Sequence, residues 1–270
     1  MSDAVTLGKN NRVAEICLDR PLKHNAMTPA MAEQLAAACV EINQDDQIRC
    51  AIIFGAGSKA FCAGSDVRAL DQYESVFHFR NRIDYSTELR SIRKPVIAAL
   101  KGWTLGGGLE LALSADVRVA ARSTLLGAPE VGLGWVGAGG ASQLLPRLVG
   151  YGRALYLLLD GDPIDAARAA AWGLVETLVS EGEELSEARA LAERWARHST
   201  VALQTVKASV RQSMSTPLEA GLRFENETMS LSFALKNDSA GRARFREGDT
   251  IDKASDGPGG ASEDDGGQKR

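Results

Sequence analysis

The sequence has few of the residues on which metal and redox sites depend. It contains three histidines and four cysteines in 270 residues, and it has no CxxC pair and no histidine near a cysteine at metal-ligand spacing. We therefore expect no structural zinc and no other bound metal. The cysteines should be buried as small hydrophobic residues in a reducing compartment; they are Cys17, Cys39, Cys50 and Cys62.

Clustered positive charge and long apolar runs are also missing. The formal net charge is −4, acids and bases are interspersed, and no Lys/Arg-rich run is interleaved with aromatic residues, so we expect no nucleic-acid partner. No apolar run approaches the roughly 20 residues that a membrane helix needs. Met1-Ser2-Asp3 begins neither a basic signal segment nor an Arg-rich transit helix. These features predict a globular, cytoplasmic protein without a membrane partner.

A strand, loop and helix order recurs along the chain. Residues 5–7 and 13–18 alternate like a hairpin, and Thr28-Pro29 supplies an N-cap and a first-turn proline for a helix that ends near Asn43. Later apolar runs, each followed by a loop and a helix, are typical of buried parallel strands; they are residues 50–54, 96–100, 116–120 and 174–179. The pattern predicts an α/β fold with a layered core.

Two glycine-bearing stretches follow predicted strands and could carry chemistry. Residues 61–67 form a turn entering a helix, which is also a common structural junction. Residues 102–110 place three consecutive glycines before Glu110, although each glycine inside a helix costs about 0.5–1 kcal/mol relative to alanine. Free N–H groups at such a helix start suit an oxyanion. A phosphate is less favoured, because no GK[ST] follows. Tight helix packing, with Glu110 as a mere first-turn acid, is the alternative.

A third glycine-bearing stretch, residues 128–140, contains Glu130 and a formal GxGxxG at Gly132, Gly134 and Gly137. A dinucleotide fingerprint belongs between an early strand and its helix, with an acid about 20 residues further on. Here the glycines follow Pro129-Glu130 instead, so we do not expect a dinucleotide site.

Taken in order and spacing, these blocks resemble a known family. FCAGSDV (residues 61–67), KPVIAALKGWTLGGGLELALSADVRVA (94–120) and LLGAPEVGLGWVGAGGASQLLPRLVG (125–150) are similar to the signature blocks of the enoyl-CoA hydratase/isomerase (crotonase) superfamily. The resemblance continues through DRPLKHNAMTPAM (19–31) and LDGDPIDAARAAAWGLVETLV (159–179), and it covers about residues 5–248. Five ordered segments are far more specific than one glycine cluster.

The resemblance implies a crotonase-like spiral of repeated ββα units with a helical C-terminal region. It assigns residues 1–184 to the spiral core with the acyl-CoA site, and residues 185–248 to a helical trimerisation region. The expected assembly is a homo-trimer or a dimer of trimers. Residues 249–270 have almost no apolar side chains to offset their ordering entropy, and we expect a disordered tail there.

The resemblance also implies a catalytic site. The backbone N–H groups of Ser65 and Gly107 would hold the thioester oxygen as an oxyanion hole. Glu110 would help to activate the water that attacks C3, and Glu130, 20 residues later, would exchange a proton with C2. Two carboxylates converging on one water cannot both ionise comfortably, so one should hold a proton near neutral pH. No cofactor is expected, because coenzyme A is part of the substrate.

Substrate-binding residues carry over from the resemblance as well. For Lys23 and Arg68, ordinary surface charge is an equal alternative to a coenzyme A contact. Between residues 70 and 93, Tyr73, Phe77, His78 and Phe79 are bulky candidates for the acyl-pocket wall, of which we select Tyr73 and Phe77. Trp135 joins that pocket, with a core role as the alternative. The expected coenzyme A contacts are Lys23, Ala26, Ala63, Asp66, Val67, Arg68 and Phe245.

The resulting function is reversible syn hydration of a trans-2-enoyl-CoA to a 3-hydroxyacyl-CoA. Double-bond isomerisation, or dehydration of a specialised acyl-CoA such as a carnitinyl-CoA-like thioester, is the alternative within the superfamily. Members that only isomerise often keep the second glutamate and lose the first, so the presence of Glu110 favours hydration. A non-catalytic oligomeric binding protein is the alternative from another class, and the paired glutamates argue against it.

Overall fold

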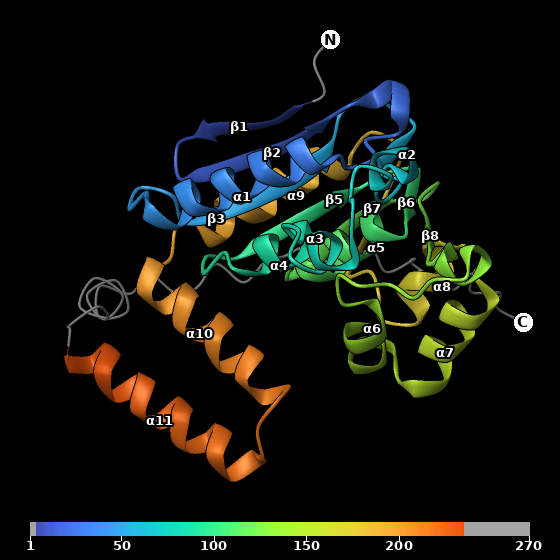
Figure 1. Cartoon of the computed structure of the whole chain (residues 1–270). Helices are drawn as coiled ribbons and strands as arrows, with labels where there is room; N and C mark the ends of the chain where they lie inside the picture. Colours follow the sequence, from blue (N-terminus) through green and yellow to red (C-terminus); the bar gives the residue numbers. More distant parts are fainter. Residues whose placement is uncertain (1–3, 235–270) are drawn as a thin grey trace, which may run out of the picture.

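The computed structural model describes residues 4–234 and contains two sheets. The large sheet has six strands in the order β1-β2-β3-β5-β7-β10 (Figure 1). Its first two strands form the predicted antiparallel hairpin, and the others are parallel to their neighbours. The strands are β1 (Ala4–Asn10), β2 (Val13–Asp19), β3 (Cys50–Gly55), β5 (Val96–Leu100), β7 (Val117–Ala121) and β10 (Thr177–Val179).

A smaller sheet has four strands in the order β4-β6-β8-β9, in which β4, β6 and β8 run parallel. Each of β3, β5 and β7 is followed at once by a strand of the smaller sheet and then by helix. This repetition is the ββα spiral that the sequence predicted. The strands are β4 (Ala60–Cys62), β6 (Trp103–Leu105), β8 (Leu125–Gly127) and β9 (Ile164–Asp165).

Helices cover both faces of the large sheet, and this explains the continuous apolar runs. Successive strand residues point to opposite faces, so Ile53 packs with the cluster that includes α1 and α5 while Ile52 packs against Ala188 and Ala192 of α9. The predicted N-cap of α1 is confirmed, since the Thr28 hydroxyl accepts the Met31 N–H at 3.3 Å. The helices involved are α1 (Pro29–Gln44), α4 (Tyr85–Arg90), α5 (Gly107–Ser114) and α9 (Glu184–Trp195).

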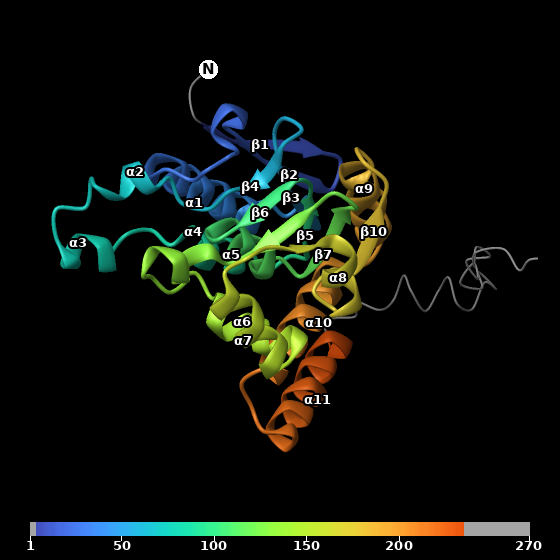
Figure 2. The same ribbon diagram turned by 90° about the vertical axis from the view of Figure 1, so that its right-hand side faces the viewer.

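The remaining helices extend from this body. The segment with α2 and α3 reaches out on one side, and α10 and α11 project together below the sheets (Figure 2). Within residues 4–234, no helix is long and apolar enough to cross a membrane. Phe245 and the predicted tail lie outside the described residues. The helices are η1 (Pro21–Lys23), α2 (Val67–Leu70), α3 (Val76–Arg80), η2 (Pro129–Leu133), α6 (Ala141–Val149), α7 (Tyr151–Asp160), α8 (Ala166–Ala171), α10 (Thr200–Ser213) and α11 (Leu218–Ala234).

Candidate active site

The ends of three neighbouring strands bring the predicted chemistry together. β4 runs into the turn that carries Ser65, β6 runs into the glycines that begin α5, and β8 runs into η2, which carries Glu130. The three strands are parallel neighbours, so their carboxyl ends meet at one edge of the small sheet. Glu110 lies in the first turn of α5. One sheet edge therefore gathers four groups that are far apart in sequence.

The turn after β4 lies against the start of α5. A Cβ built on Gly64 would lie 3.1 Å from the backbone nitrogen of Gly107, so the two segments are in van der Waals contact. Among the described residues, the N–H groups of Ser65 and Gly107 have no hydrogen-bond acceptor in the protein. Both N–H groups are thus available to an oxyanion at the helix start, where the helix dipole also favours negative charge.

The consecutive glycines have a steric cause. A Cβ on Gly108 would lie 2.0 Å from the carbonyl oxygen of Cys62, and a Cβ on Gly107 would lie 1.8 Å from the Tyr85 hydroxyl oxygen. Tight packing of this helix, which the sequence left as the alternative explanation of the glycines, is therefore present here. Only glycine lets α5 start so close to β4 and α4.

Glu110 is buried, with 5% of its surface exposed, and it is held by the loop before α6. Its Oε1 accepts the backbone N–H of Gly139 at 2.7 Å and that of Ala141 at 3.1 Å. The next helical turn holds its backbone, because the Ser114 hydroxyl donates to the Glu110 carbonyl oxygen at 2.7 Å. One carboxylate oxygen is therefore fixed, and Oε2 is left for a ligand or water.

Glu130 faces the same cavity from the opposite loop. A Cβ on Gly106 would lie 3.1 Å from Glu130 Oε1, which places this carboxylate beside the start of α5. The cavity has a volume of about 150 Å³ and is lined by both glutamates, by Ser65 and by Gly107. The two carboxylates and the two N–H groups thus line one small cavity.

Burial changes the acidity of both glutamates. Removal from water raises the pKa of Glu110, the backbone N–H groups of Ala141 and Gly139 oppose that change, and the charge of Glu130 adds to it. Burial likewise raises the pKa of Glu130. Both carboxyls therefore hold a proton more readily than exposed glutamates do, as general acid and base catalysis near neutral pH requires.

Comparison with known proteins agrees with this geometry. The profile of the family described as enoyl-CoA hydratase/isomerase matches residues 8–252. The chain belongs to the enoyl-CoA hydratase/isomerase family. It is 34% identical over 247 residues to a crotonyl-CoA hydratase from Syntrophomonas wolfei, with 90% of this chain and 95% of the relative covered. It is 32% identical over 248 residues to a short-chain-enoyl-CoA hydratase from Clostridium acetobutylicum, with coverages of 90% and 94%.

Solved structures of the family share the fold. An enoyl-CoA hydratase from Bacillus anthracis superposes with a TM-score of 0.84 at 32% identity, covering 90% of this chain and 96% of the other. One from Mycobacterium tuberculosis gives a TM-score of 0.84 at 33% identity, with coverages of 91% and 96%. The crotonase-like fold predicted from the sequence is confirmed.

The predicted coenzyme A residues fall into two groups. Ala63 and Val67 line the cavity, and Val67 is 52% exposed at its rim. Asp66 instead binds within the protein: its carboxylate accepts Arg20 Nη1 at 2.7 Å and caps α2 through the N–H of Arg68 at 3.1 Å. Ala26 belongs to the same contact, because its carbonyl oxygen accepts Arg20 Nη1 at 3.2 Å. Lys23 and Arg68 are exposed on the surface beside this group.

The predicted acyl-pocket residues are only partly brought together. Trp135 lines the cavity and is 49% exposed. Phe79 also lines it, whereas Tyr73 is not a lining residue and packs edge-on against Phe79 with ring centroids 5.5 Å apart. Phe77 is 71% exposed and is not a lining residue either. In the short helix α3, positions 77 and 79 cannot share a face, and position 79 is the one that turns inward.

The selection of site residues from the sequence missed Tyr85 and Asn25. The Tyr85 hydroxyl lies 2.8 Å from Ser65 Oγ and lines the cavity. Asn25 is fully buried, and its side-chain amide donates to the carbonyl oxygens of Ala56, Ala60 and Phe61 at 3.0 to 3.2 Å. It thereby joins the loop after η1 to β4 and to the loop between β3 and β4. Asn25 has a positive φ of 57°, and its residue type, which tolerates that region, was the one signal present in the sequence.

Arg90, a third residue that the sequence did not single out, supports Glu110 through one intervening peptide. Arg90 Nη1 donates to the Gly139 carbonyl oxygen at 2.7 Å and to Ser114 Oγ at 3.2 Å. Gly139 in turn donates its N–H to Glu110. The guanidinium therefore fixes the loop that fixes the carboxylate.

We expect Arg90→Ala to lower kcat about 10- to 100-fold with a much smaller change in KM, since Glu110 would lose its alignment while the substrate contacts remain. Steady-state kinetics on the preferred enoyl-CoA checks this. Arg90→Lys should recover part of the rate, and Arg80→Ala, on the exposed surface of α3, should change nothing. An equal loss in the Arg80 variant would contradict a specific role for Arg90.

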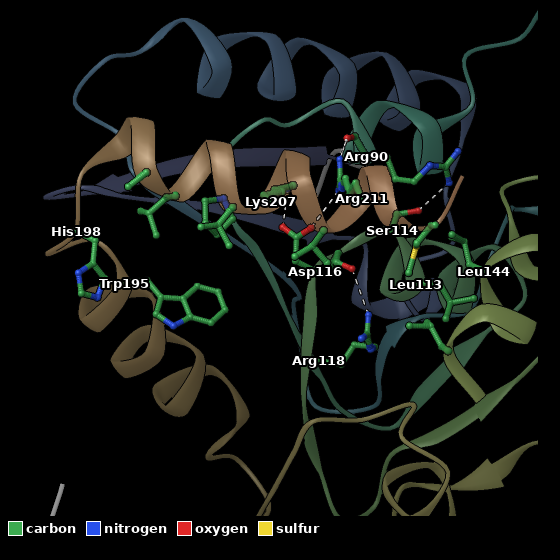
Figure 3. Close-up of a pocket in the computed structure, with 18 of the residues that line it drawn as sticks. Arg90, Leu113, Ser114, Asp116, Arg118, Leu144, Trp195, His198, Lys207 and Arg211 are labelled. Atoms are coloured by element: carbon green, nitrogen blue, oxygen red, sulfur yellow. Dashed lines mark hydrogen bonds and ion pairs between the residues drawn. The ribbon is translucent and has the colours of Figure 1, made fainter. Parts of the chain in front are cut away.

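A second and larger cavity, of about 940 Å³, lies between α10 and the body. Figure 3 shows Lys207 and Arg211 of α10 directed at Asp116, with Lys207 Nζ 2.6 Å and Arg211 Nη2 3.1 Å from its oxygens. Burial lowers the pKa of Lys207 to about 8, and Asp116 opposes that change. The lining is otherwise mainly apolar and includes neither Glu110 nor Glu130. The candidate active site is therefore the smaller cavity, which both glutamates line.

The cysteines behave as predicted for small hydrophobic residues. Cys39, Cys50 and Cys62 are buried, Cys17 is half-buried, and all four are free thiols. Burial raises the pKa of Cys62 to about 12, which keeps the thiol protonated at the end of β4, just before the turn that carries Ser65. Over residues 4–234, no three His, Cys, Asp or Glu side chains gather in a way that could hold a metal ion.

Proposed function

We propose that this chain catalyses reversible syn addition of water to a trans-2-enoyl-CoA, giving a 3-hydroxyacyl-CoA. The observation that carries the proposal is the shared cavity: two carboxyls with raised pKa values face two backbone N–H groups that have no acceptor in the described protein. Relatives named crotonyl-CoA hydratase and short-chain-enoyl-CoA hydratase support it.

The mechanism follows from the placement of each group. The thioester oxygen would accept hydrogen bonds from the N–H groups of Ser65 and Gly107, which stabilise the enolate-like oxygen as charge moves onto it. One such donor typically contributes about 2.7–4 kcal/mol to transition-state stabilisation. Glu110, fixed through Oε1, would position and deprotonate a water for attack on C3, and Glu130 would deliver a proton to C2. The two roles reverse in dehydration.

Isomerisation and specialised dehydration use the same cavity, so a direct assay is needed to separate them. The chain should convert crotonyl-CoA to 3-hydroxybutyryl-CoA, measured as loss of enoyl-thioester absorbance and identified by mass spectrometry. It should move the double bond of a trans-3-enoyl-CoA much more slowly. Rapid double-bond migration without water addition would replace hydration by isomerisation, and no reaction of either kind would favour a non-catalytic binding protein.

We propose that coenzyme A enters only as part of the substrate and that no metal or redox cofactor takes part. The two carboxyls and the oxyanion donors supply the acid, the base and the charge stabilisation that water addition needs. A cytoplasmic location stays a prediction, since relatives from Dictyostelium discoideum and Bos taurus carry mitochondrial names.

We also propose that the chain assembles as a homo-trimer or a dimer of trimers. Neither α10 nor α11 contains a fully buried residue, and both carry exposed apolar side chains. The two helices project together from the body (Figures 1 and 2). Exposed apolar faces of this kind are typical of protein contacts. The exposed side chains include Val206, Val210, Leu222, Met229, Leu231 and Phe233.

Sedimentation velocity should give a mass of three or six chains at micromolar concentration. The double variant Val210→Glu, Met229→Glu should sediment with a smaller mass than the parent. Each substitution would place a charged side chain in the proposed contact between subunits, where it would be removed from water. A parent chain that sediments as a monomer would overturn the proposed assembly.

A further inference from the structure

We infer that Arg82 selects the acyl group, and that the preferred substrate is a short enoyl-CoA whose far end carries a carboxylate. This rests on the proposed function, because it names the substrate class of the same site. Among the described residues that line the glutamate cavity, Arg82 is the one lysine or arginine. It lies between α3 and α4, in the segment that forms the outer wall of that cavity.

Arg82 is held in place without being neutralised. Its guanidinium stacks on the Phe79 ring, 4.1 Å from the ring centroid, and its Nη1 donates to the Phe79 carbonyl oxygen at 2.8 Å. Across residues 4–234, the guanidinium has no ion pair with a carboxylate and no hydrogen bond other than the one to the Phe79 carbonyl oxygen. A guanidinium has five N–H donors, so most of them stay available to a ligand.

Phe79 lines the cavity and is braced by Tyr73, whose ring meets it edge-on. The contact with the Phe79 ring and the hydrogen bond to the Phe79 carbonyl oxygen thus hold the guanidinium at the cavity wall. A planar, oriented guanidinium suits the two-oxygen geometry of a carboxylate better than a mobile lysine would. The positive charge is therefore built into the wall rather than left on a free surface chain.

Three carboxyls also line the cavity. One of them accepts hydrogen bonds from the protein, and the other two have raised pKa values. Asp84 also lines it, but Asp84 Oδ1 accepts the Ser86 N–H at 3.1 Å and Oδ2 accepts the Thr87 hydroxyl at 2.6 Å, as the cap of α4. Burial raises the pKa of both Glu110 and Glu130. A carboxylate brought in by the substrate would find Arg82 as its one cationic partner.

The size of the cavity limits the acyl group to a short one. Its volume is about 150 Å³, which leaves room for few carbon atoms beyond the thioester. Arg82 lies three residues before Tyr85, whose hydroxyl contacts Ser65, so the guanidinium and the proposed oxyanion N–H groups line the same small space. We therefore take a five-carbon enedioyl thioester as the substrate of this class to test.

The test compares two thioesters of nearly equal length. trans-2-Pentenedioyl-CoA carries a free carboxylate at C5, and trans-2-pentenoyl-CoA has a methyl group at that position. The parent chain should hydrate the first with a kcat/KM about 10- to 100-fold higher, the range expected for one charge-assisted pair. Arg82→Gln should remove this preference mainly by raising KM for the dioyl substrate, and should leave the pentenoyl substrate nearly unchanged. Arg80→Gln, on exposed α3, is the matched control and should behave as the parent.

Each other outcome decides against the inference. If Arg82→Gln raises KM equally for both thioesters, Arg82 binds the coenzyme A phosphates instead. If it lowers kcat equally for both, its role is structural. A parent that hydrates pentenoyl-CoA at least as well as the dioyl thioester overturns the inference but leaves the proposed function standing. A parent that hydrates neither thioester, nor crotonyl-CoA, overturns the proposed function and this inference with it.

Discussion

Glu130→Gln should abolish hydration of crotonyl-CoA and also the exchange of the C2 proton with solvent. Glu130 is the carboxyl beside the start of α5, where the thioester enolate would form, and its raised pKa lets it hold the proton that C2 receives. Removing a general acid or base usually lowers the rate about 10²- to 10⁴-fold. Loss of enoyl-thioester absorbance measures hydration, and mass spectrometry of deuterium at C2 measures exchange.

The amide replacement keeps the size of the side chain, so the loss should appear in kcat rather than in folding. Glu33→Gln is the matched control, because Glu33 is exposed on α1, away from the cavity. Circular dichroism should show the same folded content in both variants. A Glu130→Gln protein that still exchanges the C2 proton at the parental rate would remove Glu130 from the proposed role.

Glu110→Gln should separate the two half-reactions. Glutamine still offers an oxygen to the N–H groups of Gly139 and Ala141, so the loop should stay in place, but it cannot deprotonate a water. Hydration should fall about 10²- to 10⁴-fold, while part of the C2 exchange or double-bond migration remains. Hydration at the parental rate would show that Glu110 does not activate water and would favour the isomerase alternative.

The same variant should also change stability with a defined pH dependence. The pKa of Glu110 is raised in the folded protein. As the pH rises from the ordinary glutamate pKa through the raised one, the unfolded chain loses the proton first and the free energy of unfolding falls. Glutamine avoids that loss, so Glu110→Gln should melt at a higher temperature than the parent near neutral pH, with no gain below the ordinary pKa. A gain that persists at low pH would contradict this cause.

Much of the fold could be predicted because local signals agree with tertiary contacts. Thr28-Pro29 marked the start of α1 because a capping threonine and a first-turn proline can be recognised from residue type. The runs that form β3 and β5 could be recognised because strands buried on both faces are apolar throughout. The 174–179 run is strand only over Thr177–Val179. Leu174 lies in the core just after α8 but is not part of a strand, so an apolar run indicated burial here and not strand structure.

The site was predictable where backbone chemistry demands a residue type. Gly107 and Gly108 leave no space for a side chain, so the glycine run itself marked this position. Glu110 and Glu130 were located by the family resemblance, because the local pattern alone left each of them as an ordinary surface or first-turn acid. Tyr85 contacts Ser65, 20 residues away, and Arg90 contacts Gly139, 49 residues away, and no local pattern reports such contacts. Arg82 contacts only the nearby Phe79, and its place at the cavity wall follows from the fold. Phe77 and Phe79 look equivalent in sequence, and only the orientation of α3 separates them.

Hydration of crotonyl-CoA by the unmodified chain in deuterium oxide tests the central claim most directly. Addition of water with both glutamates in place should give 3-hydroxybutyryl-CoA with one deuterium at C2, delivered to the same face as the incoming oxygen. The product's mass and its proton coupling across C2 and C3 report both facts. Deuterium at C2 without any hydroxylated product, or a product from anti addition, would contradict the account of two glutamates acting on one water at one thioester.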